Sequence, residues 1–221
     1  MTWKNWLAGL TLVSVTALVT STALSQDHKN KKSDHPAAQA GGEMDPEMAA
    51  WMAAGAVNEN HKLLEYMVGS WNCEVTNYCM GPDPATSRGK STAKWALDGR
   101  FVSYEFDGDF MGTPFHGIGY TGYDNIQKKY VSLWMDSMST AIFTDAGDYD
   151  ASSKTFTYHG EMASPTGGKI KTRSTIEIAD KDHHVMTFYH AQGDEPEARV
   201  MQITYRRANA SASAVGSSDN G

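Results

Sequence analysis

The sequence predicts an all-β protein, an antiparallel up-and-down barrel of about ten strands preceded by one or two short helices. Three observations support this prediction. Helical periodicity ends at Gly69, about ten stretches of strand length follow, and most turns between them are too short for anything but antiparallel neighbours. The expected strands are residues 70–79, 90–97, 100–107, 115–123, 129–137, 141–149, 155–162, 169–179, 183–190 and 198–206.

Short helices are expected before the first strand. Asp45 is a good capping residue, and Pro46 takes the first helical position of an Ala-rich stretch that stops at Gly55. The next stretch, NENHKLLEYMV, places its leucines and Met67 on one side and predicts a second helix. We therefore expect the strands to begin directly after a short helical entry.

Two of the predicted turns share one pattern. YDNIQKKY (residues 123–130) and YDASSKTF (residues 149–156) both have the spacing Tyr-Asp-x-x-x-Lys-x-aromatic. Each aspartate is expected to accept backbone N–H bonds within its own turn. Two equal hairpin turns, two strands apart, favour an up-and-down meander.

Ten consecutive antiparallel strands rarely remain an open sheet, because closure removes the exposed edges. A barrel of this strand number has room inside for a ligand. Alternation along the strands predicts which side chains point inward. The expected inward residues include Ala93, Trp95, Leu97, Phe156, Tyr158, Met162, Ile170, Thr172, Ser174, Ile176, Ile178, Met201, Ile203 and Tyr205.

Both ends of the chain differ from this strand-rich part. Lys4 and the apolar stretch of residues 7–19, followed by small residues at Ala23 and Ser25, indicate a signal peptide over residues 1–25 that is cleaved after Ser25. The apolar stretch is shorter than the roughly 20 residues that span a membrane. Residues 26–44 are predicted to be a disordered linker, residues 45–207 a single β-barrel domain and residues 208–221 a disordered tail. The mature protein is therefore expected in the periplasm or outside the cell, without a transmembrane span.

The formal net charge of the chain is −7, and the acidic residues are not clustered. This balance argues against nucleic acid or anionic membranes as partners. Cys73 and Cys79 are the only cysteines. On one straight strand they would lie about 20 Å apart, too far for a disulfide, so a bridge requires a sharp bend near Asn77.

Several motifs carry a family resemblance. Gly69-Ser70-Trp71 resembles the G-x-W signature of lipocalins and other calycin barrels, which implies that Trp71 closes one barrel end beneath an arginine, here Arg207 or Arg206. The motifs LLEYMVGSW, WALDGRFVSYEFDG, PFHGIGYTGYDNIQKKYVSLWMDSM, GDYDASSKTFTYHGE and MQITYRR occur in order over residues 63–207. Together they resemble a bacterial family known as the domain of unknown function numbered 1579. The resemblance implies a calycin-like barrel and transfers no established activity.

Asp136 raises the main functional question, because it shares one strand face with Tyr130, Ser132, Trp134 and Met138. If this face points inward, Asp136 is a polar anchor in a largely apolar cavity. If the opposite face of Val131, Leu133 and Met135 points inward, Asp136 is solvated. In a third arrangement Asp136 lies at the barrel rim and accepts backbone N–H bonds. Both faces are largely apolar, so alternation leaves the three open.

Other chemistry finds less support in the sequence. His184 and His190 are too far apart on one strand to ligate a metal together, and no zinc-like spacing occurs. A ten-stranded barrel holding haem through one histidine is similar to the nitrobindins, but no cofactor is predicted. No G-x-S-x-G elbow is present. The glycines at 117, 119 and 122 lie in a strand, where they are expected to allow sharp curvature or the close approach of another group.

Three functional hypotheses follow. The first is an exported barrel that binds a small apolar or amphipathic molecule, with candidate ligand-binding residues Trp95, Trp134, Asp136, Tyr158, Thr172, Ser174 and Met201. The second is an enzyme that uses the same cavity with Asp136 as acid or base, although the sequence favours a binding protein over an enzyme. The third is a structural or interaction module whose barrel is filled by its own side chains. The sequence does not indicate the ligand or the oligomeric state.

Overall fold

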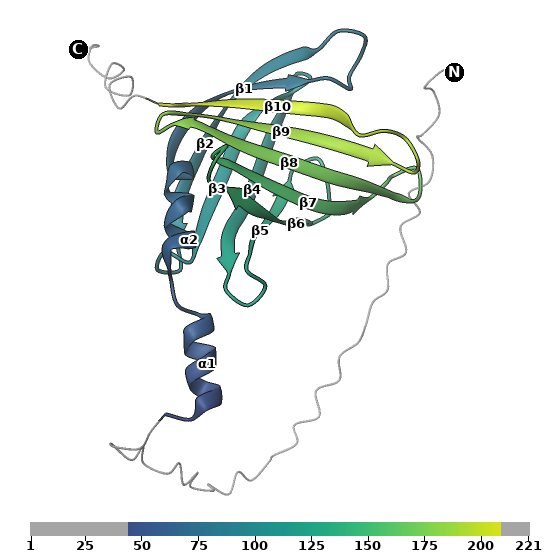
Figure 1. Cartoon of the computed structure of the whole chain (residues 1–221). Coiled ribbons are helices and arrows are strands. Elements are labelled where there is room, and N and C mark those ends of the chain that lie inside the picture. The colour runs from purple at the N-terminus through teal and green to yellow at the C-terminus, as the bar shows by residue number, and fades with distance from the viewer. Residues whose placement is uncertain (1–43, 209–221) are drawn as a thin grey trace, which may run out of the picture. The chain divides into compact units, whose positions relative to one another are not determined.

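The computed structural model describes residues 44–208, and the segment predicted to be a signal peptide lies outside this range. Within it, ten antiparallel strands follow one another around a closed barrel in which β1 pairs with β10 (Figure 1). The strands are β1 (Gly69–Asn77), β2 (Ala85–Ala96), β3 (Phe101–Phe110), β4 (Thr113–Asp124), β5 (Lys129–Asp136), β6 (Phe143–Asp150), β7 (Thr155–Ala163), β8 (Lys169–Asp180), β9 (His183–Gln192) and β10 (Ala198–Arg207). The predicted all-β barrel is confirmed.

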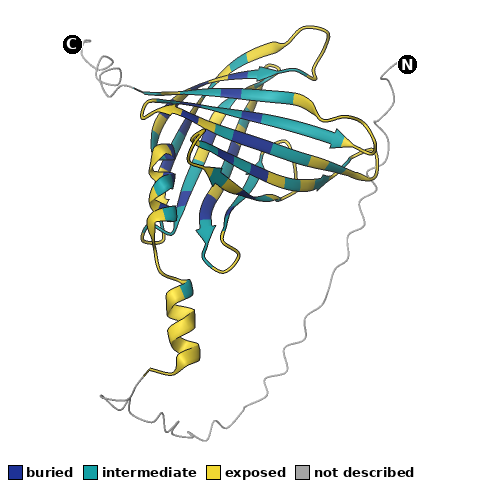
Figure 2. Cartoon of the chain, in the orientation of Figure 1, coloured by how far each residue is buried: buried dark blue, intermediate teal, exposed yellow. Residues whose placement is uncertain are grey.

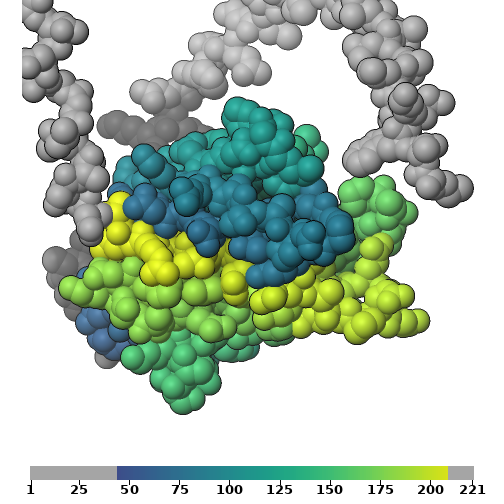
Figure 3. Space-filling model, turned by 90° about the horizontal axis from the view of Figure 1, so that it is seen from above, coloured from purple at the N-terminus to yellow at the C-terminus, as the bar shows by residue number. Residues whose placement is uncertain are grey.

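The closure is visible in the space-filling view. In Figure 3 the blue surface of the first strands and the yellow surface of the last strand meet on one face of the molecule. Trp71 lies opposite Arg207 in the β1–β10 pair, and Asn77 lies opposite Met201. Seven consecutive residue pairs join these two strands, from Trp71↔Arg207 to Asn77↔Met201, so the sheet closes without an exposed edge.

Helical structure is confined to the segment before β1. Helix α1 (Pro46–Ala54) begins at Asp45, whose carboxylate accepts the backbone N–H groups of Glu47 and Met48. Helix α2 (Glu59–Lys62) is a single turn that continues as the 3₁₀ helix η1 (Leu63–Met67). The predicted second helix is thus shorter and tighter than expected, because η1 must turn the chain into β1 at Gly69, whose φ is 138°.

The two repeated turns have the predicted construction. Asp124 accepts the N–H groups of Ile126 and Gln127, and Asp150 accepts the N–H group of Ser152. The lysine of each turn has a positive φ, 56° at Lys128 and 51° at the equivalent position, Lys154. One prediction near a turn is wrong: Leu97 is exposed, because it belongs to the turn after β2 and not to the strand.

The interior contains two apolar clusters that meet around the middle of the barrel. One cluster includes Leu64 and Met67 of η1, which pack against Val102, Phe156 and Ile178 and thereby cover one end of the barrel. The other contains Trp71, Cys73, Val75, Phe106 and Ile203, with Phe115, Trp134, Phe188, Met201 and Tyr205 packed against it. Buried residues in Figure 2 accordingly lie in the middle of the strands. Between the clusters lies a small cavity.

Candidate functional site: the barrel cavity

The cavity has a volume of about 70 Å³. A water-sized sphere needs about 10–15 Å³ on this scale, so the space corresponds to about five water molecules. Its walls combine apolar and hydroxyl-bearing side chains from nine strands and η1. The lining residues are Met67, Trp71, Ser91, Ala93, Tyr104, Thr121, Ser132, Tyr158, Ser174, Ile176, His184, Met186 and Tyr205.

The tyrosine hydroxyls of the cavity are protonated at neutral pH. Burial raises the pKa of Tyr104, of Tyr158 and of Tyr205 well above the ordinary value for tyrosine. The hydroxyl of Tyr158 lies 3.3 Å from the Thr121 hydroxyl, which is also 3.2 Å from the Val131 carbonyl oxygen. Thr121 therefore donates to that carbonyl and accepts from Tyr158, and the pair is satisfied without a ligand.

Ser174 differs from these groups because its hydroxyl lacks a partner. The residue is 4% exposed and lines the cavity, and its Oγ has no hydrogen-bond partner among residues 44–208. Ser174 lies on β8 opposite Tyr158 of β7 and Phe188 of β9. A buried hydroxyl without a partner is uncommon in folded proteins. Ser174 therefore offers a hydrogen bond to whatever occupies the cavity.

His184 forms the wall of the cavity near η1. Its ring stacks on Tyr205 at a centroid distance of 4.4 Å and meets Trp71 edge-on at 4.5 Å. Burial, followed by the charges of His183 and Arg207, lowers the pKa of His184 to about 4. The imidazole is therefore neutral at pH 7. Because no lysine, arginine, aspartate or glutamate is among the lining residues, the described cavity has no net charge.

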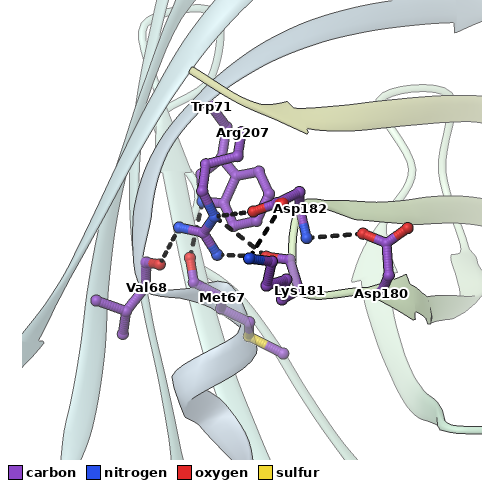
Figure 4. Close-up of polar contacts among 7 residues, drawn as sticks. All are labelled: Met67, Val68, Trp71, Asp180, Lys181, Asp182 and Arg207. Atoms are coloured by element: carbon purple, nitrogen blue, oxygen red, sulfur yellow. Dashed lines mark hydrogen bonds and ion pairs between the residues drawn. The ribbon is translucent and has the colours of Figure 1, made fainter. Parts of the chain in front are cut away.

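Arg207 holds this end of the barrel together, as Figure 4 shows. Its guanidinium lies 4.2 Å from the centre of the Trp71 ring and donates to the carbonyl oxygens of Val68 and Lys181 and to the carboxylate of Asp182. The Trp71 indole N–H donates to the Met67 carbonyl oxygen at 2.9 Å. Together these contacts fasten η1 to β1, to β10 and to the β8–β9 turn.

A stack of aromatic rings fills the lumen on the other side of the cavity. Trp134 lies nearly parallel to Tyr104 and to Phe115, with centroid distances of 5.9 and 6.5 Å. Gly117 and Gly119 make room for this stack. A Cβ atom at Gly117 would lie 2.1 Å from the Trp134 ring, and one at Gly119 would lie 2.5 Å from the Tyr104 ring. The close approach predicted for these glycines is an approach of aromatic side chains.

The face of β5 that contains Asp136 points inward, since Ser132 lines the cavity and Trp134 belongs to the stack. Asp136 itself is the last residue of the strand. Its carboxylate accepts the indole N–H of Trp134 at 2.9 Å and the backbone N–H of Met138 at 2.9 Å. The inward and rim arrangements are thus both partly correct, and Asp136 positions Trp134 without lining the cavity.

A different carboxylate, that of Asp145 on β6, lies directly behind the cavity wall. It accepts the hydroxyl proton of Ser132, the residue opposite it on β5. Burial raises the pKa of Asp145, and the Ser132 hydrogen bond and the charge of His159 oppose this shift only in part. Since the Ser132 proton is directed at Asp145, the Ser132 oxygen presents lone pairs to the cavity.

Asp145 gives a prediction for pH dependence. Because its pKa is raised in the folded protein, the native state binds more protons than the unfolded state between the ordinary and the raised pKa values. Stability is therefore lost as pH rises through this window. We expect Asp145→Asn to be more stable than the unmodified chain at pH 7, with the difference shrinking as pH falls toward 4. Urea unfolding between pH 4 and 8 measures this, with the exposed Asp194→Asn as control. A variant less stable at pH 7 would contradict it.

The predicted ligand-binding residues separate into three groups. Tyr158 and Ser174 line the cavity. Trp134 and Met201 pack against the second apolar cluster, and Thr172 lies two residues before Ser174 on the same face of β8. Trp95 does not line the cavity: it is 38% exposed and lies beside α2 and η1, because β2 continues past the covered end of the barrel. The structure therefore does not bring Trp95 together with the cavity residues.

Sequence reasoning missed Tyr104, Ser91 and His184. Tyr104 lies on the same face of β3 as Val102 and Phe106, and this alternation was a usable signal. Ser91 has the same parity as Ala93 on β2, which was also a usable signal, whereas the strand of His184 has apolar residues on both faces and gave none. Cys73 is buried and Cys79 is exposed, and both are free thiols. Among residues 44–208, no group of three or more histidine, cysteine, aspartate or glutamate side chains could hold a metal ion.

Comparison with known proteins identifies the family. The family described as "Protein of unknown function (DUF1579)" matches residues 56–207, which include the whole barrel. The chain belongs to this family. The DUF1579 match begins between α1 and α2, so α1 lies outside the matched region. No curated protein matches the chain.

Three solved structures are similar to this DUF1579 chain to different degrees, and the first of them supports the barrel fold. Rv2717c from M. tuberculosis has a TM-score of 0.54 and 12% identity, with 70% of this chain and 100% of that chain covered. The S-type phycobiliprotein lyase CPES from Guillardia theta has a TM-score of 0.48 and 10% identity, covering 72% and 97% of the two chains. A redesigned β-barrel has a TM-score of 0.35 and 15% identity over 67% and 95%. Among residues 44–208, no helix has the length and apolar character needed to cross a membrane.

Proposed function

We propose that the DUF1579 barrel binds a small, uncharged amphipathic molecule in its interior cavity. The observation that carries this proposal is the Ser174 hydroxyl, which faces the cavity, is buried and has no partner among the described residues. A buried hydroxyl left unpaired costs about 1–3 kcal/mol. A ligand that accepts a hydrogen bond from Ser174 removes this cost, and the neighbouring aromatic walls bury its apolar part.

The lining restricts the chemistry of the ligand. With His184 neutral at pH 7 and no charged side chain in the wall, a charged ligand would lose its hydration without gaining an ion pair. The volume restricts its size, because pockets for drug-sized ligands are typically about 300–1,000 Å³. Met67 and Met186 line the cavity, and their flexible side chains allow a modest expansion. Compact neutral alcohols, phenols and amides fit these constraints.

The cavity supports binding more directly than catalysis. Asp136, the acid or base of the enzyme hypothesis, does not line the cavity and accepts its hydrogen bonds from Trp134 and Met138. The small volume gives specific support to the third hypothesis, a barrel filled largely by its own side chains whose outer surface binds a partner. Export rests on residues 1–25, which lie outside the described range, and stays a prediction together with the absence of a cofactor.

The proposal is tested by ligand binding to the full chain. We expect native mass spectrometry of protein from its own cells to show a bound small molecule, and calorimetry to detect compact phenols, alcohols or amides but not matching carboxylates or amines. Ser174→Ala removes the hydrogen bond and should weaken binding about tenfold, because such bonds contribute about 1–2 kcal/mol. Without ligand, the same variant should be at least as stable as the unmodified chain.

Ser103→Ala is the matched control for this test. Ser103 lies on β3 beside Tyr104, on the opposite face of the strand, and its replacement should leave ligand affinity unchanged. If no neutral compound binds and no co-purified molecule is found, the filled-barrel function takes precedence. If ligands bind equally well to Ser174→Ala, the cavity at Ser174 is not their site.

A further inference from the structure

Helix α1 has an apolar face that nothing among residues 44–208 covers. Met48, Trp51 and Met52 follow the spacing of one helix face, and each is more than half exposed, with Trp51 at 65%. No residue of α1 is buried, and Figure 2 shows the helix exposed over most of its length. Isolated helices shorter than about 12–15 residues are marginal in water. A partner that covered this face would therefore stabilise the nine-residue helix.

The same chain has a groove on its outer surface that complements this face. The groove, at the end of the barrel covered by η1, has a volume of about 830 Å³. Leu63, Tyr66, Val68 and Trp95 form its apolar wall. Its cations are already paired, Lys62 with Glu59, and Lys181 and Arg207 with Asp182. The match between the groove and α1 is therefore one of apolar character, with Met48, Trp51 and Met52 as the side chains that would fill the groove.

Three hydrogen bonds at the end of helix α1 oppose its docking into the groove of its own chain. Asn125 in the β4–β5 turn donates to the carbonyl oxygens of Ala54 and Ala56, at 2.8 and 2.7 Å, and Arg100 donates to that of Gly55 at 3.0 Å. Only four residues, 55–58, separate α1 from α2, and the next residue, Glu59, already borders the groove. Folding α1 back onto this groove would break those three hydrogen bonds.

From this geometry we propose that two copies of the chain form a symmetric dimer in which each α1 occupies the groove of the other. Exchange in both directions closes the assembly, whereas one-way docking would continue into a filament. One helix about 14 Å long covers only part of the roughly 1,200–2,000 Å² that a stable interface buries, and two exchanged helices double that area. A lipid surface fits less well, because helices that lie on membranes are typically rich in lysine and arginine.

Sedimentation velocity of the full chain between about 1 and 100 µM tests the proposal. The unmodified chain should be a dimer. Trp51→Glu on α1 and Tyr66→Glu in the groove should each give monomers with unchanged circular dichroism, since both side chains are exposed. Ile142→Glu, at an equally exposed position in the β5–β6 loop, should remain dimeric. An equimolar mixture of the first two variants keeps one intact α1 and one intact groove, so it should recover dimer at the higher concentrations.

Two results would overturn the dimer. One is an unmodified chain that stays monomeric at 100 µM, and binding of such a monomer to phospholipid vesicles through Trp51 would assign α1 to a membrane instead. The other is a dimer that persists in Trp51→Glu, which would place the contact elsewhere. Neither result depends on the interior cavity, so the dimer and ligand binding are tested independently of each other.

Discussion

Trp71→Ala is expected to lower the free energy of unfolding by about 4 kcal/mol, the typical loss for a buried aromatic side chain. Trp71 is 2% exposed and contacts the cavity, the His184 ring and the Arg207 guanidinium at once. Its indole N–H also donates to Met67. Removing the ring leaves that carbonyl without its donor and leaves a void beside the existing cavity. Urea unfolding followed by circular dichroism measures the change.

A double-mutant cycle separates the contribution of Arg207 from that of the Trp71 ring. Arg207→Met removes the cation together with the planar group that bonds Val68, Lys181 and Asp182. The coupling between Trp71 and Arg207 should be about 1 kcal/mol, as expected for a cation–π pair. Tyr120→Ala on the exposed side of β4 is the control and should cost little. A loss below 1.5 kcal/mol for Trp71→Ala would show that this end of the barrel does not depend on the clamp.

Acid is expected to destabilise the protein through His184. The folded-state pKa of about 4 lies below the ordinary value of 6.5, so the unfolded state binds more protons between these two values. The contribution of neutral His184 is complete above pH 6.5 and is lost as pH falls toward 4. The shift corresponds to a loss of about 3 kcal/mol over this window. The protonated ring would face Trp71 and Tyr205 with the cations of His183 and Arg207 nearby.

His184→Gln isolates this effect from the other titrating groups. The difference in unfolding free energy between the unmodified chain and the variant should change by about 3 kcal/mol between pH 7 and 4. Asp145 acts in the opposite direction, which is why the difference is the informative quantity. His116→Gln, on the exposed side of β4, is the matched control. Parallel curves for the unmodified chain and His184→Gln would refute the prediction.

The fold was predictable because its signals are local. Turn residues such as Asp124 and Asp150 mark hairpins through bonds to their own neighbours, and strand alternation needs only the adjacent sequence. The limits appear where local signals end. Strand alternation places Trp95 on the inward face, but it does not show how far along the barrel axis the residue lies. In the structure Trp95 lies outside the cavity, beside α2 and η1.

The cavity was only partly predictable for the same reason. Tyr158 and Ser174 face each other across β7 and β8, and alternation alone assigns both to the interior. Sequence does not show which carboxylate, Asp136 or Asp145, lies next to the cavity. That depends on how far each strand extends toward the barrel rim, which is a property of the closed barrel. The Ser174 hydroxyl is unpaired because no polar group among residues 44–208 lies within hydrogen-bond distance of it, and no sequence pattern indicates this.

The position of η1 has a consequence for exchange kinetics. Met67 forms part of the cavity wall, while the stack around Trp134 fills the lumen on the other side. A guest that passes either of these places would have to displace the side chains there, so their movement would slow both its entry and its exit.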